Sequence, residues 1–289
     1  MLTRIALGLI WLLHFLPLAW LAALGQAFGT VLYWLGRERR HITLTNLRLC
    51  LPQLDDAQRE ALARAHFRAF GRSFLERGLL WWAPPQTIRR LVRIEGIEHL
   101  RRQDGRPLIL FVPHFVGLDM GWTRLTLECD MVSIYAQQKN FYFNAALRKG
   151  RTRFGDSLLL SRQEGVRQAI RSMKGGRPFY YLPDMDYGQR DTIFVPFFGV
   201  PAATITGLSR LARMTGAAIV PCVTRMLPGG AGYVVQLGAP WTQFPGESID
   251  ADTLRMNAFI ESCVREMPEQ YFWVHKRFKT RPPGAAGIY

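Results

Sequence analysis

The hydrophobic pattern of the chain begins with a long apolar segment at the N-terminus. Residues 5–36 contain no Asp, Glu, Lys or Arg, and about 20 apolar residues are enough for a helix to span a bilayer. Trp11, Trp20 and Trp34 recur along the segment, as aromatic side chains do at membrane interfaces. Pro17 would bend such a helix. The pattern predicts a membrane anchor, either a bent span or a re-entrant insertion into one leaflet.

Basic residues follow this segment at once, with three arginines in residues 37–40. Positive charge beside a membrane segment tends to stay in the cytoplasm. We therefore predict that residues 1–40 form an anchor with a basic exit and that residues 41–289 form a cytoplasmic domain. A buried pair of soluble helices and a cleaved signal peptide are the alternatives. The signal peptide is disfavoured because the apolar character continues past Ala27, the nearest small-residue site.

A helical pattern follows the anchor. The spacing of Phe67, Phe70 and Phe74 predicts a helix over residues 55–82 whose aromatic stripe faces the core. A charged stripe on the opposite side of this helix is formed by Arg64, Arg68 and Arg72. Further helices are predicted over residues 164–174, 205–214 and 250–267.

Short apolar runs with turn signals alternate with these helices. They predict strands over residues 93–96, 107–112, 131–135, 157–160, 178–182, 217–220 and 233–237. Strands that alternate with helices indicate a sheet covered by helices on its faces. We predict an α/β fold, with a mixed, largely parallel central sheet flanked by helices and an N-terminal hydrophobic anchor helix. No repeat or linker divides residues 41–289.

The charge and composition of the chain limit the classes of molecule that it could bind. The chain has 32 Arg and 5 Lys against 22 Asp and Glu, which gives a formal net charge of +15. The planar guanidinium group binds phosphate in a bidentate way, so the excess favours nucleic acid, an anionic membrane face or a phosphorylated substrate as partner. The four cysteines lie far apart and lack the paired spacing of a zinc or redox site.

The candidate chemistry begins with His114 and Asp119 in PHFVGLD, directly after the predicted strand 107–112. Pro113 ends that strand. An imidazole at a strand end, with a carboxylate nearby, can take a proton from an alcohol. Positions five apart are about 140° from each other on one helix, so we expect His114 in a loop and Asp119 in the first turn of the next helix, with Gly117 easing the bend. The pair predicts acyl or phosphoryl transfer to a hydroxyl.

The same spacing recurs in His99 and Asp104, in a polar stretch before the strand. An Asp-Gly turn signal lies there. We interpret this second copy as exposed surface. The spacing alone does not mark a site, and unlike His114 and Asp119 this pair does not follow the end of a strand.

Three more clusters could contribute. The stretch LRKGRTRF contains Arg148, Arg151 and Arg153, and Arg162 follows a predicted strand. These arginines could bind a phosphate or a phosphopantetheine group, although a solvated charge run has the same composition.

Asp184 and Asp186 follow another predicted strand, in LPDMDYGQRD. Two acids without a nearby histidine form a poor metal site, so holding the arginines in register is the favoured role. The closing run EQYFWVHKRFKTR interleaves aromatic and basic residues. Such a run is typical of a single-stranded nucleic-acid platform, or of a closing element whose aromatic residues are core.

Together, PHFVGLD, the arginine-rich stretch, PDMDYGxRxxxFVPFFG and EQYFWVHKRFKTRP resemble the late acyltransferases of bacterial lipid A biosynthesis. The chain resembles lauroyltransferase-like members, within the His-x4-Asp glycerolipid acyltransferase superfamily. The resemblance extends over essentially the whole chain, including the anchor. Some members have Glu at the position of Asp119, and either carboxylate could serve.

The resemblance implies transfer of a fatty acyl chain from acyl carrier protein to a hydroxyl of a lipid A precursor of the Kdo-lipid IVA type, at the cytoplasmic face of the bacterial inner membrane. His114 would be the general base and Asp119 would orient its imidazole. The implied substrate-binding residues are Arg148, Arg151, Arg153, Arg162, Asp184 and Asp186. No metal, cofactor or nucleic acid is expected.

Two alternatives stay open. One is an acyltransferase that acts on a lysophospholipid or another glycolipid. The other is a membrane-tethered protein that binds nucleic acid or anionic lipid.

Overall fold

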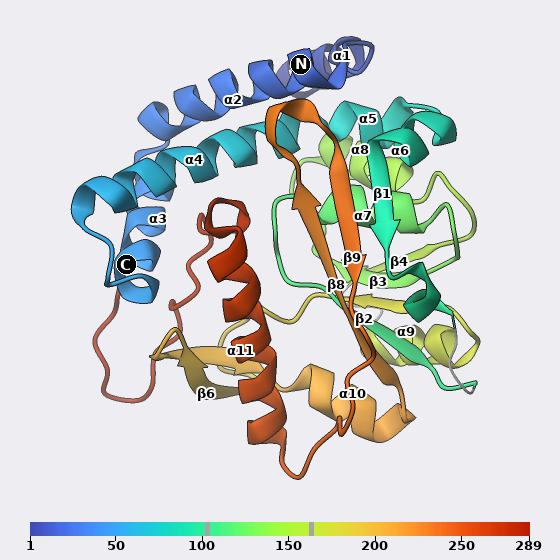
Figure 1. The fold of residues 1–289 in the computed structure, drawn as a ribbon, viewed down its shortest axis with the longest axis vertical. Helices are drawn as coiled ribbons and strands as arrows, with labels where there is room; N and C mark the ends of the chain where they lie inside the picture. The colour runs from blue at the N-terminus through green and yellow to red at the C-terminus, as the bar shows by residue number, and fades with distance from the viewer. Residues whose placement is uncertain (102–104, 162–164) are drawn as a thin grey trace.

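The fold is organised around one mixed sheet (Figure 1). The computed structural model describes residues 1–101, 105–161 and 165–289. The strands of this sheet are β1 (Val92–Glu95), β2 (Leu108–Phe111), β3 (Val132–Tyr135), β4 (Leu158–Ser161), β5 (Phe179–Tyr181), β8 (Ala218–Met226) and β9 (Tyr233–Leu237). They lie in the order β1-β9-β8-β2-β5-β3-β4.

The pairing confirms the predicted sheet. Within this seven-stranded sheet five of the neighbouring pairs are parallel, and the pair of β8 with β9 is antiparallel. Each predicted strand is present, although β8 continues to Met226, well beyond the predicted end at residue 220. The sheet is mixed and largely parallel, as expected from the alternation of strands and helices.

Helices cover both faces of this sheet. The helices are α1 (Leu2–Leu13), α2 (Leu18–Leu35), α3 (Arg37–Cys50), α4 (Asp56–Leu75), α5 (Arg77–Trp82), α6 (Pro85–Leu91), α7 (Leu118–Leu125), α8 (Phe141–Arg151), α9 (Gly165–Lys174), α10 (Gly207–Thr215) and α11 (Ile249–Glu266). Successive strand residues point to opposite faces. Leu110 joins the cluster of Trp122 on α7, whereas Ile109 joins that of Leu211 on α10. The fold therefore has two cores separated by the sheet.

The apolar N-terminal segment forms two helices, α1 and α2, that are separated at Pro17. α2 lies along α4 (Figure 1). Small residues permit this contact, because a Cβ atom on Gly71 would lie 2.4 Å from the Gly25 carbonyl oxygen and 2.6 Å from the Gly29 Cα atom. By length and composition α2 could cross a membrane, and about 33% of it is buried against the protein. The anchor segment is therefore packed on the domain along one side.

Three local predictions need correction. Residues 55–82 form two helices, α4 and α5, rather than one. Arg72 is buried instead of lying in a solvated stripe, because its Nε donates to Glu76 at 2.9 Å. The sequence patterns also missed the antiparallel hairpin of β6 (Thr192–Phe197) and β7 (Val200–Ile205). Pro196 and Pro201 lie within this hairpin, and proline weakens a strand signal.

Candidate active site

Two neighbouring parallel strands bring His114 and Asp184 together. Phe111 at the end of β2 is paired with Tyr181 at the end of β5. Each strand then continues through an apolar residue and a proline to its polar residue, so the same step places His114 beside Asp184. The Asp184 carboxylate accepts hydrogen bonds from the His114 amide at 2.8 Å and from His114 Nδ1 at 2.5 Å.

This contact selects a tautomer. An ionised carboxylate can only accept hydrogen bonds, so the proton of a neutral imidazole lies on Nδ1. The Asp184 side chain is fully buried, and the His114 side chain is 17% exposed. Nε2 has no hydrogen-bond partner within residues 1–101, 105–161 and 165–289. His114 therefore has one nitrogen fixed and one free to accept a proton.

Asp119 lies in the first turn of α7, and His114 lies in the preceding loop, as predicted. The expected hydrogen bond between them is not formed among the described residues. Asp119 Oδ1 instead accepts from Arg151 Nε at 3.0 Å and Nη2 at 2.5 Å, and Oδ2 lies 3.7 Å from Arg77 Nη2. This corrects the orienting role expected for Asp119, because Asp184 occupies the nitrogen that it would have held.

Both carboxylates are ionised. Burial would raise the pKa of Asp184, but the charge and hydrogen bonds of His114 outweigh it and hold that pKa below its usual value. Burial would also raise the pKa of Asp119, and Arg151 and Arg77 hold it low. Asp119 also interacts electrostatically with His114. The second carboxylate can thus favour an imidazolium without touching it.

Close packing against β8 sets the position of α7. Gly117 has a φ of −83°, which any residue adopts, so it does not ease a bend as expected. Its function is close approach, because a Cβ atom there would lie 3.0 Å from the Thr224 carbonyl oxygen. At Gly121 a Cβ atom would lie 2.1 Å from Thr224 Oγ1. The two glycines let the helix that bears Asp119 pack directly on the strand.

A second close contact positions Arg151. A Cβ atom on Gly150 would lie 1.9 Å from Trp81 Cδ1, so α8 touches α5 through the glycine. The indole Nε1 of Trp122 on α7 donates to the Arg151 carbonyl at 2.8 Å. The end of α8 is therefore fixed to both α5 and α7, where Arg151 meets Asp119.

The other predicted arginines have different surroundings. Arg148 is exposed on α8. Arg153 donates to the Ala83 carbonyl and stacks over Phe154, with 4.1 Å between the guanidinium carbon and the ring centroid. Burial lowers the pKa of Arg153 to about 10. Arg162 and Asp104 lie outside the described residues. Of the four arginines, the structure therefore brings Arg151 to Asp119.

Asp186 braces the C-terminal segment instead of holding arginines. Its carboxylate accepts from the Thr280 amide at 2.6 Å, from Thr280 Oγ1 at 2.8 Å and from the Gly188 amide at 2.9 Å. Its own amide donates to His275 Nε2 at 3.1 Å. Burial, with the nearby charge of His114, lowers the pKa of His275 to about 4, so this imidazole is neutral.

The closing aromatic and basic run belongs to the core. Tyr271, Trp273 and Phe278 are buried. Arg277 is also buried and donates to the Ala203 carbonyl at 2.8 Å and to Thr204 Oγ1 at 2.9 Å. These buried side chains cannot serve as a stacking platform, so this run does not support the nucleic-acid alternative.

Sequence reasoning missed two features of this site. It listed Asp184 as a substrate-binding residue, although the repeated strand-x-Pro-polar step could have paired it with His114. It did not identify Arg77, which lies in the predicted helix beside the aromatic stripe. No spacing signal marks Arg77, because only the tertiary contact of α5 with α7 brings it to Asp119.

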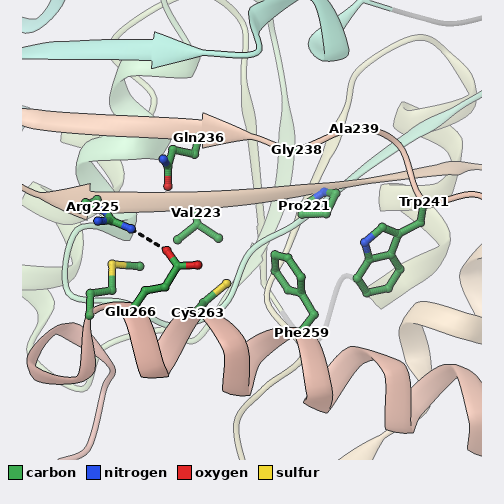
Figure 2. A pocket seen from close by; sticks show the side chains of 11 residues that line it. Pro221, Val223, Arg225, Gln236, Gly238, Ala239, Trp241, Phe259, Cys263 and Glu266 are labelled. Atoms are coloured by element: carbon green, nitrogen blue, oxygen red, sulfur yellow. Dashed lines mark hydrogen bonds and ion pairs between the residues drawn. The ribbon is translucent and has the colours of Figure 1, made fainter.

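One cavity among the described residues lies away from these side chains. It has a volume of about 340 Å³ and is enclosed between α11 and strands β8 and β9 (Figure 2). Apolar side chains such as Val223, Phe259 and Cys263 line it, with the Arg225–Glu266 ion pair at one end. It does not include His114, Asp119 or Asp184 in its lining. A crevice of about 10 Å³ lies beside Asp119 itself.

The arrangement suits one kind of chemistry. A fixed imidazole with a free Nε2 can remove a proton from a hydroxyl. The two guanidinium groups beside Asp119 can hold a substrate anion. No cluster of three or more His, Cys, Asp or Glu side chains that could hold a metal occurs within the part of the chain that the structure describes.

Comparison with known proteins shows what the whole chain is similar to. The family profile described as bacterial lipid A biosynthesis acyltransferase matches residues 1–280. The chain is 33% identical to the lipid A biosynthesis lauroyltransferase of Escherichia coli, over 100% of this chain and 94% of that protein. It is 31% identical to the palmitoleoyltransferase of the same organism over the same shares of both chains. It is 30% identical to the myristoyltransferase, over 93% of this chain and 83% of that protein.

Proposed function

Because the chain belongs to the family of bacterial lipid A biosynthesis acyltransferases and is an acyltransferase of that pathway, we propose that it transfers a fatty acyl group from acyl carrier protein to a hydroxyl of a lipid A precursor of the Kdo-lipid IVA type. The observation that carries this proposal is the His114–Asp184 pair at the ends of two neighbouring strands.

In the proposed reaction His114 Nε2 removes the proton of the acceptor hydroxyl. The hydroxyl oxygen attacks the thioester carbonyl carbon, and a carbon–oxygen bond forms. The carbon–sulfur bond then breaks, and the imidazolium returns the proton to the departing thiolate. Asp184 holds the tautomer and stabilises the imidazolium, as the carboxylate does in serine hydrolase triads. Because the acceptor oxygen is itself the nucleophile, this sequence needs no acyl-enzyme.

Asp119 and Arg151 supply the electrostatic part of the mechanism. The charge of His114 is one of the causes that hold the pKa of Asp119 low, after Arg151 and Arg77. Arg151 is held by two hydrogen bonds to one oxygen of Asp119. Its side chain is 20% exposed, so it can also bind an anionic group of the substrate. A strand-end amide or a guanidinium would stabilise the oxyanion that forms from the thioester carbonyl.

We further propose that residues 1–40 attach the protein to the cytoplasmic face of the inner membrane by insertion into one leaflet, with residues 41–289 as the catalytic domain. α2 is packed along α4, and its outer side exposes Trp20, Leu24 and Trp34. Phe141 and Tyr142 on α8 are also exposed. Together they form an apolar surface suited to the acyl-chain boundary of a bilayer.

α1, which precedes α2 in the chain, contacts α8 directly. Arg4 on α1 donates to the Tyr142 hydroxyl at 3.0 Å, and Asn140 donates to Thr3 Oγ1 at 2.9 Å. If the insertion involves one leaflet, tags at the N-terminus and the C-terminus should be digested from the same side of sealed vesicles. Digestion from opposite sides would instead establish a span.

The activity is tested with purified protein in mixed micelles, a panel of acyl carrier protein donors and a lipid A precursor. We expect acyl transfer by the wild type and its loss in His114→Ala, with circular dichroism showing a folded protein. His99→Ala is the matched control and should retain near-normal activity. A lysophospholipid offered as acceptor tests the alternative substrate class. Transfer to that acceptor alone would refute the lipid A assignment.

A further inference from the structure

Arg77 is a nearly buried cation with unused hydrogen-bonding capacity. Its side chain is 22% exposed, and its Nε is buried without a partner among the described residues. Its one ion pair, to Asp119 Oδ2, has a nitrogen–oxygen distance of 3.7 Å, which is too long for a hydrogen bond. A guanidinium group has five N–H donors, and leaving them unmet in a buried site is costly.

Two other buried arginines, Arg72 and Arg277, also leave one nitrogen without a partner among the described residues, but both donate hydrogen bonds to the protein. Arg72 donates to Glu76 at 2.9 Å and to the Leu227 carbonyl at 3.0 Å. Arg277 donates to a carbonyl and to the Thr204 hydroxyl. These two arginines therefore hydrogen-bond to other parts of the protein. Arg77 instead lies over the rings of Phe74 and Phe143, with the Asp119 carboxylate beyond hydrogen-bond distance.

The position of Arg77 indicates what it could bind. It lies beside Asp119, which also holds Arg151 and interacts electrostatically with His114. The neighbouring Gly78 touches α1, because a Cβ atom there would lie 2.5 Å from the Ile10 carbonyl oxygen. Arg77 thus lies between the proposed bilayer surface and the proposed general base, at the level where a lipid headgroup would enter.

Charge supports an anionic ligand. Two guanidinium groups share the single negative charge of Asp119, so the cluster retains a net charge of about +1. Arg151 takes both of its hydrogen bonds to Oδ1. Arg77 makes no hydrogen bond among the described residues and so has more free N–H groups for a second anion than Arg151 has, and its planar fork matches phosphate.

We propose that Arg77, held beside Arg151 by Asp119, is a phosphate-binding residue of the active site. This inference rests on the proposed function, in which both substrates carry phosphate: the acceptor on its sugars and the donor in its phosphopantetheine arm. Asp119 then has a positioning role toward both arginines in addition to its electrostatic effect on His114.

The test separates binding from chemistry. Arg77→Gln should raise the KM of one phosphate-bearing substrate roughly 10- to 100-fold, the size expected for a lost charged hydrogen bond, with kcat within about 3-fold. Arg77→Lys should recover part of the loss, since it keeps the charge without the fork. Arg90→Gln, which removes an exposed charge on α6, is the control and should leave both KM values unchanged.

Two arms identify the source of the phosphate. One assay uses a dephosphorylated acceptor, and the other uses an acyl-pantetheine donor that lacks phosphate. In one of these two assays the increase in KM caused by Arg77→Gln should disappear, which shows which substrate carries the phosphate that Arg77 binds. A penalty that is equal in all arms and confined to kcat would overturn the proposal, because it would indicate an oxyanion or purely structural role.

The phosphate site can also be tested without the assigned reaction, by measuring the binding of inorganic pyrophosphate. Inorganic pyrophosphate should raise the melting temperature of His114→Ala and of His114→Ala/Arg90→Gln, but not of His114→Ala/Arg77→Gln. An equal rise in all three would refute the phosphate site even if the protein were an active acyltransferase. A selective rise without any transfer to a lipid A precursor would support the site and refute the assigned reaction. If Arg77→Gln does not fold, Arg77→Lys takes its place in both assays.

Discussion

The two carboxylates near His114 are held in opposite ways. Asp184 is fully buried and accepts two hydrogen bonds from His114. Asp119 is 15% exposed and lies between two guanidinium groups. Asp119 is five positions from His114 in the chain, and Asp184 is 70 positions away. The contact follows the sheet, because the ends of adjacent parallel strands are closer in space than two residues separated by a turn.

This difference assigns separate tasks to the two regions. Asp184 lies where an imidazole can be oriented, in surroundings that exclude water. Asp119 lies where cations can be gathered at the surface of the site. A single carboxylate could not do both, since a tight bond to His114 and two guanidinium partners would compete for the same oxygens.

The largest effect should come from Asp184→Asn. The side-chain amide cannot hold the imidazolium by charge, and it can stabilise the wrong tautomer. We expect kcat to fall roughly 10³- to 10⁴-fold, by analogy with the carboxylate of a hydrolase triad, with little change in either KM. Steady-state kinetics on folded protein would check this. Asp186→Asn should mainly lower the melting temperature. If it lowered kcat as much as Asp184→Asn does, Asp184 would have no special role in catalysis.

How much of the fold and of the candidate site could be predicted from the sequence depends on whether a feature is set by local sequence or by tertiary contacts. The strands were predictable because buried parallel strands appear as short apolar runs, and His114 followed from its place after β2. The β6–β7 hairpin was missed because its prolines hide the strand pattern. The Asp184 contact and Arg77 were missed because strand order and helix packing are set by tertiary contacts. Those contacts leave no periodic signal in one chain.

Lowering the pH should destabilise the fold through His275, the partner of the Asp186 amide. The pKa of His275 is about 4 in the folded protein and about 6.5 in the unfolded chain. The unfolded state therefore binds the proton first, so His275 makes the free energy of unfolding fall between pH 6.5 and pH 4, by about 3 kcal/mol in all. Arg77 and Arg151 stay charged over this range.

Denaturant titrations across this pH range would measure the effect. His275→Gln should make the decline smaller, because its side-chain oxygen can accept from the Asp186 amide without titrating. Part of the decline should remain, because burial also lowers the pKa of His66 to about 4. His41→Gln, at an exposed position, should leave the decline unchanged. If the free energy of unfolding fell equally with pH in both variants, protonation of His275 would not be the cause of the fall.

Asp119→Asn should have a smaller effect than Asp184→Asn and one of a different kind. Loss of the charge releases Arg151 and Arg77, whose interactions with a carboxylate are worth about 1.5–3 kcal/mol. We expect kcat/KM to fall roughly 10- to 150-fold, mainly through a higher KM. If kcat fell as far as in Asp184→Asn while KM stayed constant, Asp119 would share the orienting task and the comparison would fail.

The smallest effect should come from Gly150→Ala, which changes no charged group of the site. The added methyl group meets the Trp81 ring at 1.9 Å, so α8 must move away from α5, at a cost of about 1–3 kcal/mol for overpacking. Because α8 carries Arg151, the shift should raise KM a few-fold while kcat stays close to wild type. Gly8→Ala is the matched control, since a Cβ atom on that helical glycine meets nothing within 4 Å. It should be neutral or stabilising. If Gly150→Ala lowered the melting temperature without changing KM, then the position of α8 would matter for the fold but not for the arginine that it brings to Asp119.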